Sequence, residues 1–195
     1  MSNSETQTRI LDAAWHLARR DGLNAVTVGA IAKAAGVSRQ LVYFHFTNRA
    51  GLLVAMTRHQ DTRSGFRERA WATRELDPVP AFEALVRAWL EYLPEILPIA
   101  YALEAAVITG DDGAVAWHDR MGELREAFQF AVQRLAAAGA LADGWTVDAA
   151  TDWVWARAQP SNRRHLVDER GWAAGDYVDR AVASILGEIC GSRNV

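Results

Sequence analysis

The stretch GVSRQLVYFHFTNRAGLL, residues 36–53, decides how the N-terminal part of this chain folds. Gly36 is suited to end a helix, because glycine accepts the left-handed conformation that is common at helix C-termini. Ser38 and Asn48 are suited to begin helices, because their side chains can accept a hydrogen bond from a free backbone N–H of the first turn. The stretch therefore predicts a helix that ends at Gly36, a second helix over residues 39–45 and a third directly after Asn48.

Two helices are predicted before this stretch. Thr27 can cap a short one that continues to Ala35. An earlier helix should end at Gly22, and its apolar residues recur at helical spacing on one face: Ile10, Leu11, Ala14, Trp15, Leu17 and Ala18. Helix, tight turn and helix over residues 28–45 form the pattern of a helix-turn-helix, whose second helix enters the major groove of DNA by its N-terminal end.

The residue types at the second of these helices fit that use. An apolar inner face is needed to hold the crossing angle, and it is available in Ile31, Val37, Leu41 or Val42, and Phe46. Polar side chains are needed at the exposed start of the helix, where Ser38, Arg39 and Gln40 stand. Arginine and glutamine are the side chains best shaped for paired hydrogen bonds to guanine and adenine edges. Arg39 and Gln40 are therefore the predicted base-reading residues.

The remainder of the chain also has helical periodicity, and no convincing strand pattern is present. Residues 73–80 indicate a loop, and Pro160 should end or kink its helix. The longer amphipathic segments cover residues 81–93, 95–108, 114–140, 146–158 and 176–190. We expect an all-α protein with two domains: a helix-turn-helix DNA-binding domain at 1–55 and a larger helical domain for effector binding and dimerisation at 56–195.

Composition sets broad limits on the class of protein. Half of the 195 residues are apolar and 23% are charged, which is typical of a globular chain. No apolar run approaches the roughly 18 residues that a membrane span needs, so no membrane partner is expected. The N-terminus carries no hydrophobic stretch typical of a secretory signal. A single cysteine, Cys190, excludes an intrachain disulfide and fits a reducing, cytoplasmic location.

Charge is distributed unevenly along the chain. Residues 1–58 hold seven Lys/Arg against three acidic residues, whereas the remainder holds 14 basic and 21 acidic residues. A basic segment favours contact with a polyanion such as DNA, through its field and through the release of counterions. Chance segregation of a few charges is the alternative.

Residues 8–54 resemble the DNA-binding domain of the TetR family of bacterial transcriptional regulators. The matching pieces are the first-helix pattern ILDAAWHLARRDG, then TV..IA..AGVS, then YFHF, and an arginine shortly before LL. The segment WVWARAQPSNRRHLVDERGW, residues 153–172, also resembles a variant tail found in part of that family. The resemblance implies a dimeric, ligand-responsive DNA-binding regulator, by default a repressor, that a small effector releases from a palindromic operator.

The resemblance also implies roles for the matching residues. Thr27, Tyr43, His45 and Arg49 would contact the sugar-phosphate backbone, while Ser38 lies at the start of the reading helix. Arg39 and Gln40 would read bases, with apolar contacts from Leu41 or Tyr43 to thymine methyl groups. This chain departs from the family pattern in three places: Arg49 replaces the usual lysine, Gly51 replaces a charged helix former and Leu41 replaces a frequent threonine. None of these changes removes a required group, but Leu41 and Gln40 leave the operator sequence open.

The central aromatic residues suggest an effector site. The resemblance places the effector pocket on the central helices, and the interior of a helical bundle suits an apolar ligand. We expect a mainly hydrophobic effector, with Glu104 or Arg125 as a polar anchor. The predicted lining is Trp89, Tyr92, Tyr101, Glu104, Trp117, Met121, Arg125 and Phe128. The alternative is that these aromatic residues only pack the core.

Binding to a palindromic operator requires two DNA-binding domains, so a homodimer is expected. By resemblance the last helices provide the interface, and their apolar residues could form a self-complementary patch. The predicted set is Ala149, Trp153, Val178, Val182, Ile185, Leu186 and Ile189. An effector that binds the conformation with wrongly spaced DNA-binding domains would lower the affinity for DNA.

Other classes of protein are possible. An enzyme is disfavoured, because the sequence contains no Gly-x-Ser-x-Gly, no P-loop and no dinucleotide-binding glycine pattern. No cofactor or metal is expected, since the five histidines show no pairing four residues apart. A helical small-molecule-binding protein with a vestigial DNA-binding domain is a second alternative, and an activator that uses the same domain is a third.

Overall fold

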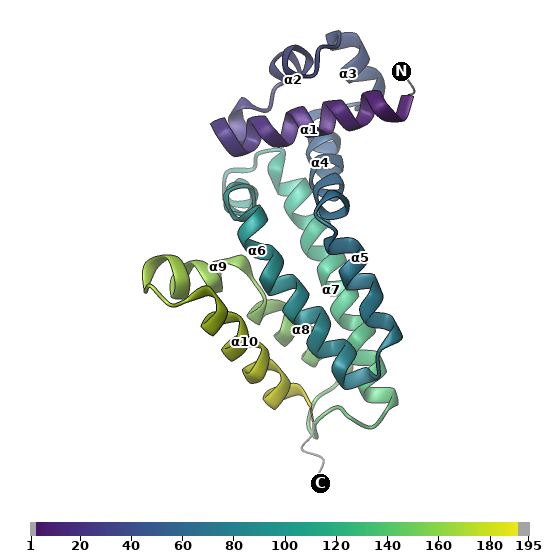
Figure 1. The fold of residues 1–195 in the computed structure, drawn as a ribbon, viewed down its shortest axis with the longest axis vertical. Coiled ribbons are helices and arrows are strands. Elements are labelled where there is room, and N and C mark those ends of the chain that lie inside the picture. The colour runs from purple at the N-terminus through teal and green to yellow at the C-terminus, as the bar shows by residue number, and fades with distance from the viewer. Residues whose placement is uncertain (1–2, 191–195) are drawn as a thin grey trace. The chain divides into compact units, whose positions relative to one another are not determined.

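The computed structural model describes residues 3–190, and this part of the chain is helical almost throughout (Figure 1). It contains no strand, and only an isolated antiparallel bridge joins Leu141 to Cys190. The elements are α1 (Asn3–Asp21), η1 (Leu23–Ala25), α2 (Val28–Ala35), α3 (Arg39–His45), α4 (Arg49–Arg63), α5 (Phe66–Ala72), η2 (Thr73–Glu75), α6 (Pro78–Thr109), α7 (Gly113–Ala137), α8 (Val147–Arg157), α9 (Pro160–Arg163), η3 (Arg164–Glu169) and α10 (Ala174–Ile189). The predicted all-α class is confirmed.

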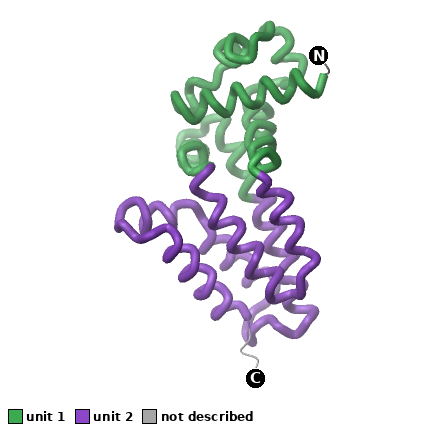
Figure 2. The backbone as a smooth tube through the Cα atoms, in the orientation of Figure 1, with its two compact units in different colours: residues 1–64, 96–121 green, residues 65–95, 122–195 purple. Residues whose placement is uncertain are grey.

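The chain divides into two compact units (Figure 2). Unit 1 joins residues 1–64 to residues 96–121, and unit 2 joins residues 65–95 to residues 122–195. The predicted domain boundary at residue 55 therefore falls inside α4, and the end of α6 clusters with the N-terminal helices. The assignment of DNA binding and effector binding to separate domains stays a prediction.

The predicted caps begin the helices of unit 1. The hydroxyls of Thr27 and Ser38 accept hydrogen bonds from the backbone N–H groups of Ala30 (3.2 Å) and Leu41 (3.1 Å). Asn48 Oδ1 accepts one from the N–H of Gly51 at 2.8 Å. Gly36 has φ 64°, the left-handed conformation that ends α2 and turns the chain into α3.

The core of unit 1 joins the N-terminal helices to the end of α6 and the start of α7. Fully buried apolar side chains of α1, α2, α3 and α4 meet there, including Ile10, Ile31, Val42 and Leu53. The same cluster contains Ile99 and Leu103 of α6 and Ala116 of α7, with Trp117 partly buried against it. A helix-turn-helix of this length would bury little apolar surface alone, so α6 and α7 supply part of its support.

Helix α6 differs from the prediction, because residues 81–93 and 95–108 belong to one continuous helix of 32 residues. Pro94 and Pro98 are exposed and lie four residues apart, so both fall on one side of the helix. Each lacks an N–H and removes a helical hydrogen bond. Burial of neighbouring apolar side chains compensates, since Leu93 is fully buried and Ile99 nearly so. Tertiary packing therefore outweighs the local preference for a break.

By length and composition α6 is also the one described helix that could cross a membrane. This is weak evidence, because a long core helix of a water-soluble domain passes the same test. Side chains along α6 pack inside each of the two units, which accounts for its apolar composition.

The core of unit 2 is built around aromatic residues of α5 and α6. The rings of Phe66 and Tyr92 are stacked, with centroids 4.5 Å apart and planes 7° apart. Trp89 lies beside both rings and donates a hydrogen bond from Nε1 to the carbonyl of Ala158 at 2.8 Å. Phe128 of α7 is fully buried. These contacts connect α5, α6 and the end of α8 in one apolar interior.

The chain changes direction after α8 as expected. Ala158 ends the helix, and Pro160 begins α9 at its first position, where a missing N–H costs nothing. A π-helical segment, η3, follows, and α10 then runs from Ala174 to Ile189. Trp145 and Trp153 attach α10 to the α8 region through hydrogen bonds to the carbonyl and carboxylate of Glu188.

Tyr177 of α10 gives a test of the packing in unit 2. It is 3% exposed, and its hydroxyl has no hydrogen-bond partner among residues 3–190. Burial raises the pKa of Tyr177 to about 12, against the opposing effect of Arg163 and Arg157. An unfolded tyrosine loses its proton near pH 10, so the free energy of unfolding should fall as the pH rises from about 10 to about 12.

Tyr177→Phe should therefore remove this alkaline loss and raise the free energy of unfolding by about 1 kcal/mol at neutral pH, because an unpaired buried hydroxyl is lost. Urea denaturation at pH 7 and pH 11 measures both effects. Tyr43→Phe, on a side chain that is 58% exposed, is the control. A destabilised Tyr177→Phe variant would show that the hydroxyl is paired in solution.

Candidate nucleic-acid interface

Helix α3 presents polar and aromatic side chains to solvent from a rigid base. Val42 is fully buried and Phe46, its C-cap, is 7% exposed, and together they hold the helix in the core of unit 1. Arg39 and Gln40 are exposed at the first turn, and Tyr43 is 58% exposed one turn later. Such an arrangement can offer hydrogen-bond donors, acceptors and a flat ring to a groove without moving the backbone.

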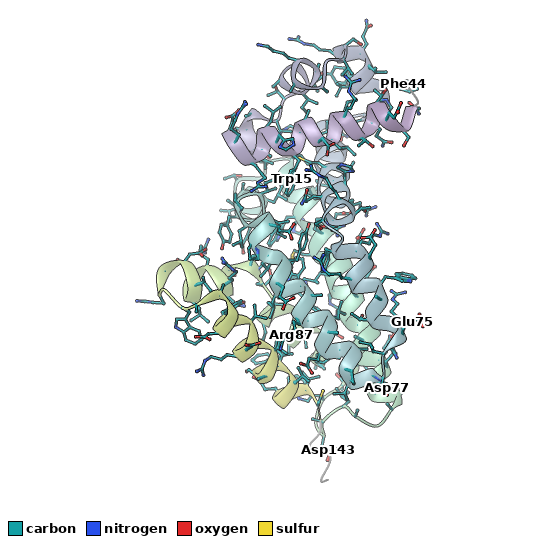
Figure 3. All side chains as sticks on the ribbon, in the orientation of Figure 1. Trp15, Phe44, Glu75, Asp77, Arg87 and Asp143 are labelled. Atoms are coloured by element: carbon teal, nitrogen blue, oxygen red, sulfur yellow. The ribbon has the colours of Figure 1, made fainter. Side chains whose placement is uncertain are left out.

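Phe44 is 74% exposed on the same helix (Figure 3), and it is not among the predicted DNA-binding residues. The helical period contained a signal for it. Val42 and Phe46 point inward, and a residue midway between two inward positions four apart must point outward. On a helix that enters a DNA groove, such an exposed ring could contact thymine methyl groups or sugars.

The hydroxyls of Thr27 and Ser38 cap helices in the protein without DNA. Each accepts the capping hydrogen bond described above, and both residues are exposed. A capping hydroxyl keeps its own proton available for donation. Thr27 stands at the N-terminus of α2, where free N–H groups favour an anion, so donation to a phosphate is compatible with its cap.

His45 and Leu41 are less accessible than expected. The Nε2 atom of His45 is covered and has no hydrogen-bond partner in the described part of the chain, while its ring lies against Phe44 at 5.4 Å between centroids. Leu41 is partly buried. The predicted backbone contact of His45 therefore requires the second ring nitrogen or a movement of the ring.

Arg49 of α4 makes contacts that sequence reasoning missed. Its Nη1 donates to Asp111 Oδ1 at 2.9 Å, its Nη2 to the carbonyl of Leu23 at 3.0 Å and its Nε to the carbonyl of Val26 at 3.3 Å. The carboxylate of Asp112 lies 3.8 Å from Nη1. The predicted phosphate-binding cation is therefore already engaged, and a phosphate must share it with Asp111 or displace that carboxylate.

Asp111 is held in its ionised form. The backbone N–H of Gly113 and the guanidinium of Arg49 both bind its carboxylate and lower the pKa of Asp111 below its ordinary value. Asp111 lies in the turn between α6 and α7, and Gly113 packs so closely that a β-carbon there would lie 2.9 Å from atoms of Leu23 and Ala106. The turn is thus fitted tightly against the N-terminal helices.

Further ion pairs join α4 to the start of α7. Arg58 binds Asp119 through two hydrogen bonds of 2.6 and 3.0 Å, and Asp61 pairs with Arg120. These contacts alter the charge argument made from sequence. Unit 1 as a whole contains nine Lys/Arg and eight Asp/Glu, because the acidic residues Asp61, Glu104, Asp111, Asp112 and Asp119 belong to it. The net charge of the unit therefore gives no argument for contact with a polyanion, and exposed cations such as Arg39 must carry it.

The predicted effector residues are divided between the two units. Trp89, Tyr92 and Phe128 belong to unit 2 and are buried, and Arg125 of that unit pairs with Asp152 of α8 at 2.7 Å. The other four belong to unit 1. Met121 is buried there, and Tyr101, Glu104 and Trp117 are partly buried.

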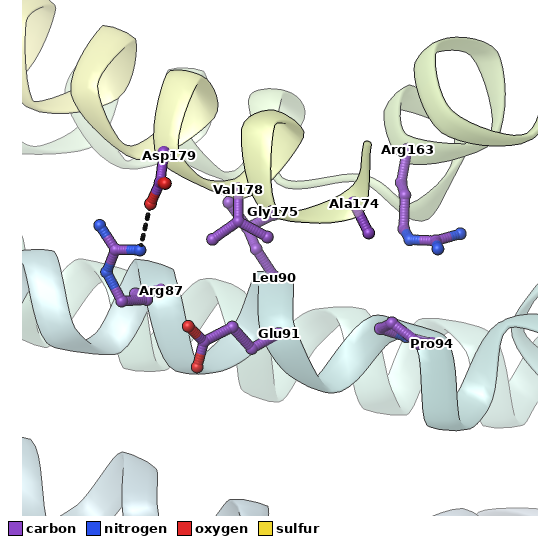
Figure 4. Close-up of a pocket in the computed structure, with 9 residues that line it drawn as sticks. All are labelled: Arg87, Leu90, Glu91, Pro94, Arg163, Ala174, Gly175, Val178 and Asp179. Atoms are coloured by element: carbon purple, nitrogen blue, oxygen red, sulfur yellow. Dashed lines mark hydrogen bonds and ion pairs between the residues drawn. The ribbon is translucent and has the colours of Figure 1, made fainter. Parts of the chain in front are cut away.

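The cavity described in unit 2 has a different lining. It is an open groove of about 370 Å³ between α6 and α10 (Figure 4). Leu90, Pro94 and Val178 contribute apolar surface, and Arg87 crosses to Asp179 at 2.7 Å. The remaining residues are Glu91, Arg163, Ala174 and Gly175. None of the predicted effector residues lines it. Within residues 3–190 no group of three or more His, Cys, Asp or Glu side chains is placed to hold a metal ion.

The predicted dimer residues separate into two sets. Val178, Val182, Ile185 and Ile189 of α10 are buried within a single chain, with at most 9% of each exposed. Ala149 and Trp153 are exposed, and Leu186 is partly buried. The inward-facing positions of α10 thus pack in the core of unit 2. The sequence could not show this, because the apolar face of a helix has the same pattern whether it packs in its own core or against a partner.

The N-terminal part of this chain is similar in sequence to known transcriptional regulators. Residues 10–56 match the family model described as bacterial regulatory proteins of the tetR family. A segment of 48 residues, 25% of this chain, is 44% identical to the HTH-type transcriptional regulator AcrR of Shigella flexneri and covers 22% of that protein. A longer segment of 126 residues, 64% of the chain, is 29% identical to the HTH-type transcriptional regulator SrpR of Pseudomonas putida and covers 56% of it. The matches thus span about a fifth to just over half of these relatives.

The fold as a whole is also shared with solved structures. The transcriptional regulator FadR of Bacillus subtilis, solved in complex with stearoyl-CoA, superposes with a TM-score of 0.71 over 93% of this chain and 98% of that one. The two sequences are 13% identical, so this likeness concerns the fold. The relatives named by these comparisons are transcriptional regulators and not enzymes.

Proposed function

The chain belongs to the TetR family of bacterial regulatory proteins, and on that premise we propose that it is a ligand-responsive, DNA-binding transcriptional regulator. The observation that carries the proposal is the exposed first turn of α3, where Arg39 and Gln40 project from a helix that Val42 fixes in the core. A rigid helix with free donors at its N-terminal end is what major-groove reading requires.

The chemistry of each side chain on this surface suggests its role in DNA binding. Arg39 and Gln40 read base edges, and the exposed rings of Tyr43 and Phe44 supply apolar contact. The hydroxyls of Thr27 and Ser38, with Arg49 and His45, contact phosphates and fix the register without reading sequence. Leu41, partly buried, adds at most a small contact to a thymine methyl.

A mobility-shift titration on the DNA upstream of the gene, across a salt series, tests the proposal. A regulator should form a sequence-preferring complex whose log affinity falls linearly with log salt concentration. Selection of bound sequences from a random pool would then give the operator. If neither experiment yields a preferred sequence at low salt, the domain is vestigial and the chain is a helical small-molecule-binding protein.

The protein acts as a homodimer in this proposal, with the exposed faces of α8 and α10 as the interface. The two helices are joined side by side by hydrogen bonds from Trp153 to Glu188 (2.5 Å) and from Arg157 to Ser184 (2.9 Å). Small exposed residues flank these contacts and would allow close approach of a second copy: Ala149, Ala156, Ala183 and Gly187. Such a face can be self-complementary about a two-fold axis.

Ala183→Glu should therefore convert the protein from twice its 21.5 kDa chain mass to the monomer, because a charge would be buried without a partner at the centre of the interface. Sedimentation at several concentrations measures the change. Ala136→Glu, on an exposed position of α7, is the matched control and should leave the mass unchanged. An unaltered dimer in the Ala183 variant would place the interface elsewhere.

The effector in this proposal is a small, largely apolar molecule whose binding weakens the complex with DNA. The stearoyl-CoA held by the FadR structure and the aromatic lining predicted on the central helices favour an apolar body. Trp117 is the test residue, because it is only partly buried beside the core of unit 1. A ligand that quenches tryptophan fluorescence should lose affinity in Trp117→Ala, and unchanged binding would contradict this site.

Repression is the expected outcome of DNA binding, with release by the effector, and the cytoplasm is the expected location of a protein that acts on the chromosome. The same surface would serve an activator. A reporter gene under the selected operator distinguishes the two, because its expression should rise when the regulator is deleted if the protein is a repressor.

A further inference from the structure

We propose that Gly29 is a specificity-determining residue of the DNA-binding surface. In this view the missing side chain of Gly29 allows the guanidinium of Arg39 to lie across the first turn of α2, which fixes the direction in which Arg39 reads a guanine. The inference rests on the proposed function and names a residue of α2 that controls what α3 reads.

The backbone gives no reason for a glycine at this position. Gly29 is the second residue of α2, and it is absent from the glycines with positive φ. Glycine is among the poorest helix formers, and α2 has only eight residues, so a glycine there weakens a short helix. Conformational freedom therefore does not explain it, and the surroundings of the missing side chain must be considered.

The three atoms nearest to that position all belong to one side chain, Arg39. A β-carbon at residue 29 would lie 3.1 Å from Nη2 of Arg39 and 3.4 Å from both Cζ and Nε. Three of the four heavy atoms of the guanidinium are thus within contact distance of the empty position, so the group lies along it instead of touching it end-on. Other helical glycines, such as Gly122 and Gly187, have nothing within 4 Å of that position.

The guanidinium of Arg39 has donors to offer to a ligand. No hydrogen bond or ion pair joins Arg39 to another of the described residues, so its N–H donors remain available to a ligand. A freely mobile arginine loses much rotamer freedom when it binds, whereas one confined by a neighbouring surface loses less. Confinement against α2 therefore prepares Arg39 for the paired contact with the O6 and N7 atoms of guanine.

Substitution of Gly29 should change sequence preference without changing contacts to phosphate. Gly29→Ala requires the guanidinium to shift by a few tenths of an ångström, whereas Gly29→Leu must expel it from α2. The experiment selects sequences from a random DNA pool with the wild type, both Gly29 variants, Arg39→Ala and Ala34→Leu. Ala34 is an exposed residue of the same helix and provides the matched control.

We expect the wild type to enrich a guanine at one position in each half-site and Arg39→Ala to lose that preference. Gly29→Leu should reduce the preference for the same guanine roughly fivefold, the low end of what a paired contact contributes, and Gly29→Ala should reduce it less. Ala34→Leu should match the wild type. The salt dependence should stay the same in both Gly29 variants, because no phosphate contact is lost.

Thermal unfolding separates this effect from damage to the fold. Gly29→Ala should be at least as stable as the wild type, since alanine favours helix, so an altered preference in that variant cannot come from unfolding. If both Gly29 variants select the wild-type sequence, or if Arg39→Ala does so, the inference is wrong although the proposed function stands. If the wild type itself selects no sequence, the proposed function fails.

Discussion

Arg49→Ala is expected to lower the affinity for operator DNA roughly ten- to hundredfold, the range that follows from the loss of a charge-assisted hydrogen bond. In the proposed complex Arg49 binds a phosphate from the start of α4. The slope of log affinity against log salt concentration should become shallower by about one for each bound DNA-binding domain, because one fewer counterion is released. Mobility-shift or fluorescence-anisotropy titrations from low to high salt measure both quantities.

The partner of Arg49 in the free protein gives the second half of this prediction. Asp111 holds the guanidinium at 2.9 Å and would repel a phosphate placed beside it. Asp111→Asn keeps an oxygen for the N–H of Gly113 but removes the charge, so the affinity for DNA should rise several-fold. Asp112→Asn, whose carboxylate is 3.8 Å away and 55% exposed, is the control and should have a small effect.

A double-mutant cycle decides whether the two residues act together. If Asp111 acts by competing for Arg49, Asp111→Asn should have no effect in the Arg49→Ala background. A weaker complex in the Asp111→Asn single variant would instead show that Asp111 positions Arg49 for the phosphate. An unchanged salt dependence in Arg49→Ala would exclude the phosphate contact itself.

Phe128→Ala is expected to lower the free energy of unfolding by about 3–5 kcal/mol, the usual cost of truncating a fully buried phenylalanine. Phe128 is 0% exposed in unit 2 and was predicted from sequence to line the effector site. Urea or guanidinium denaturation measures the change, which would be a large part of the stability of a small domain.

Phe130→Ala is the matched control, because Phe130 lies one half-turn away on α7 and is 41% exposed. Its ring contacts the guanidinium of Arg74 at 4.6 Å, so a loss of about 1 kcal/mol or less is expected. If Phe128→Ala costs no more than this control, Phe128 faces a space that a ligand can fill. In that case the predicted effector site would be favoured over the core.

The local features of the DNA-binding surface were predictable. Thr27, Ser38 and Asn48 begin helices where predicted, and Gly36 ends α2, because a cap is a hydrogen bond or a conformation confined to about one turn of chain. The exposure of Arg39 and Gln40 followed from the helical period in the same way. The exposure of Phe44 follows from the same period, although Phe44 was not among the predicted residues.

The remaining features depend on contacts between distant residues. Arg49 and Asp111 are separated by 62 positions, and nothing in the spacing of either indicates the other. The guanidinium of Arg39 rests on Gly29 only because the turn at Gly36 sets α2 beside α3. The continuation of α6 through Pro94 and the inward direction of Val182 likewise follow from burial in the assembled units.

The sequence alone thus determined the all-α class, the caps of α2, α3 and α4 and the outward residues of α3, because these depend on hydrogen bonds and periodicity within a few residues. The tertiary structure decided which charges are already paired, which apolar faces are already covered and where a missing side chain leaves room for an arginine. These are properties of packing between segments. They depend on contacts between residues that are distant in the sequence, so no short stretch of chain specifies them.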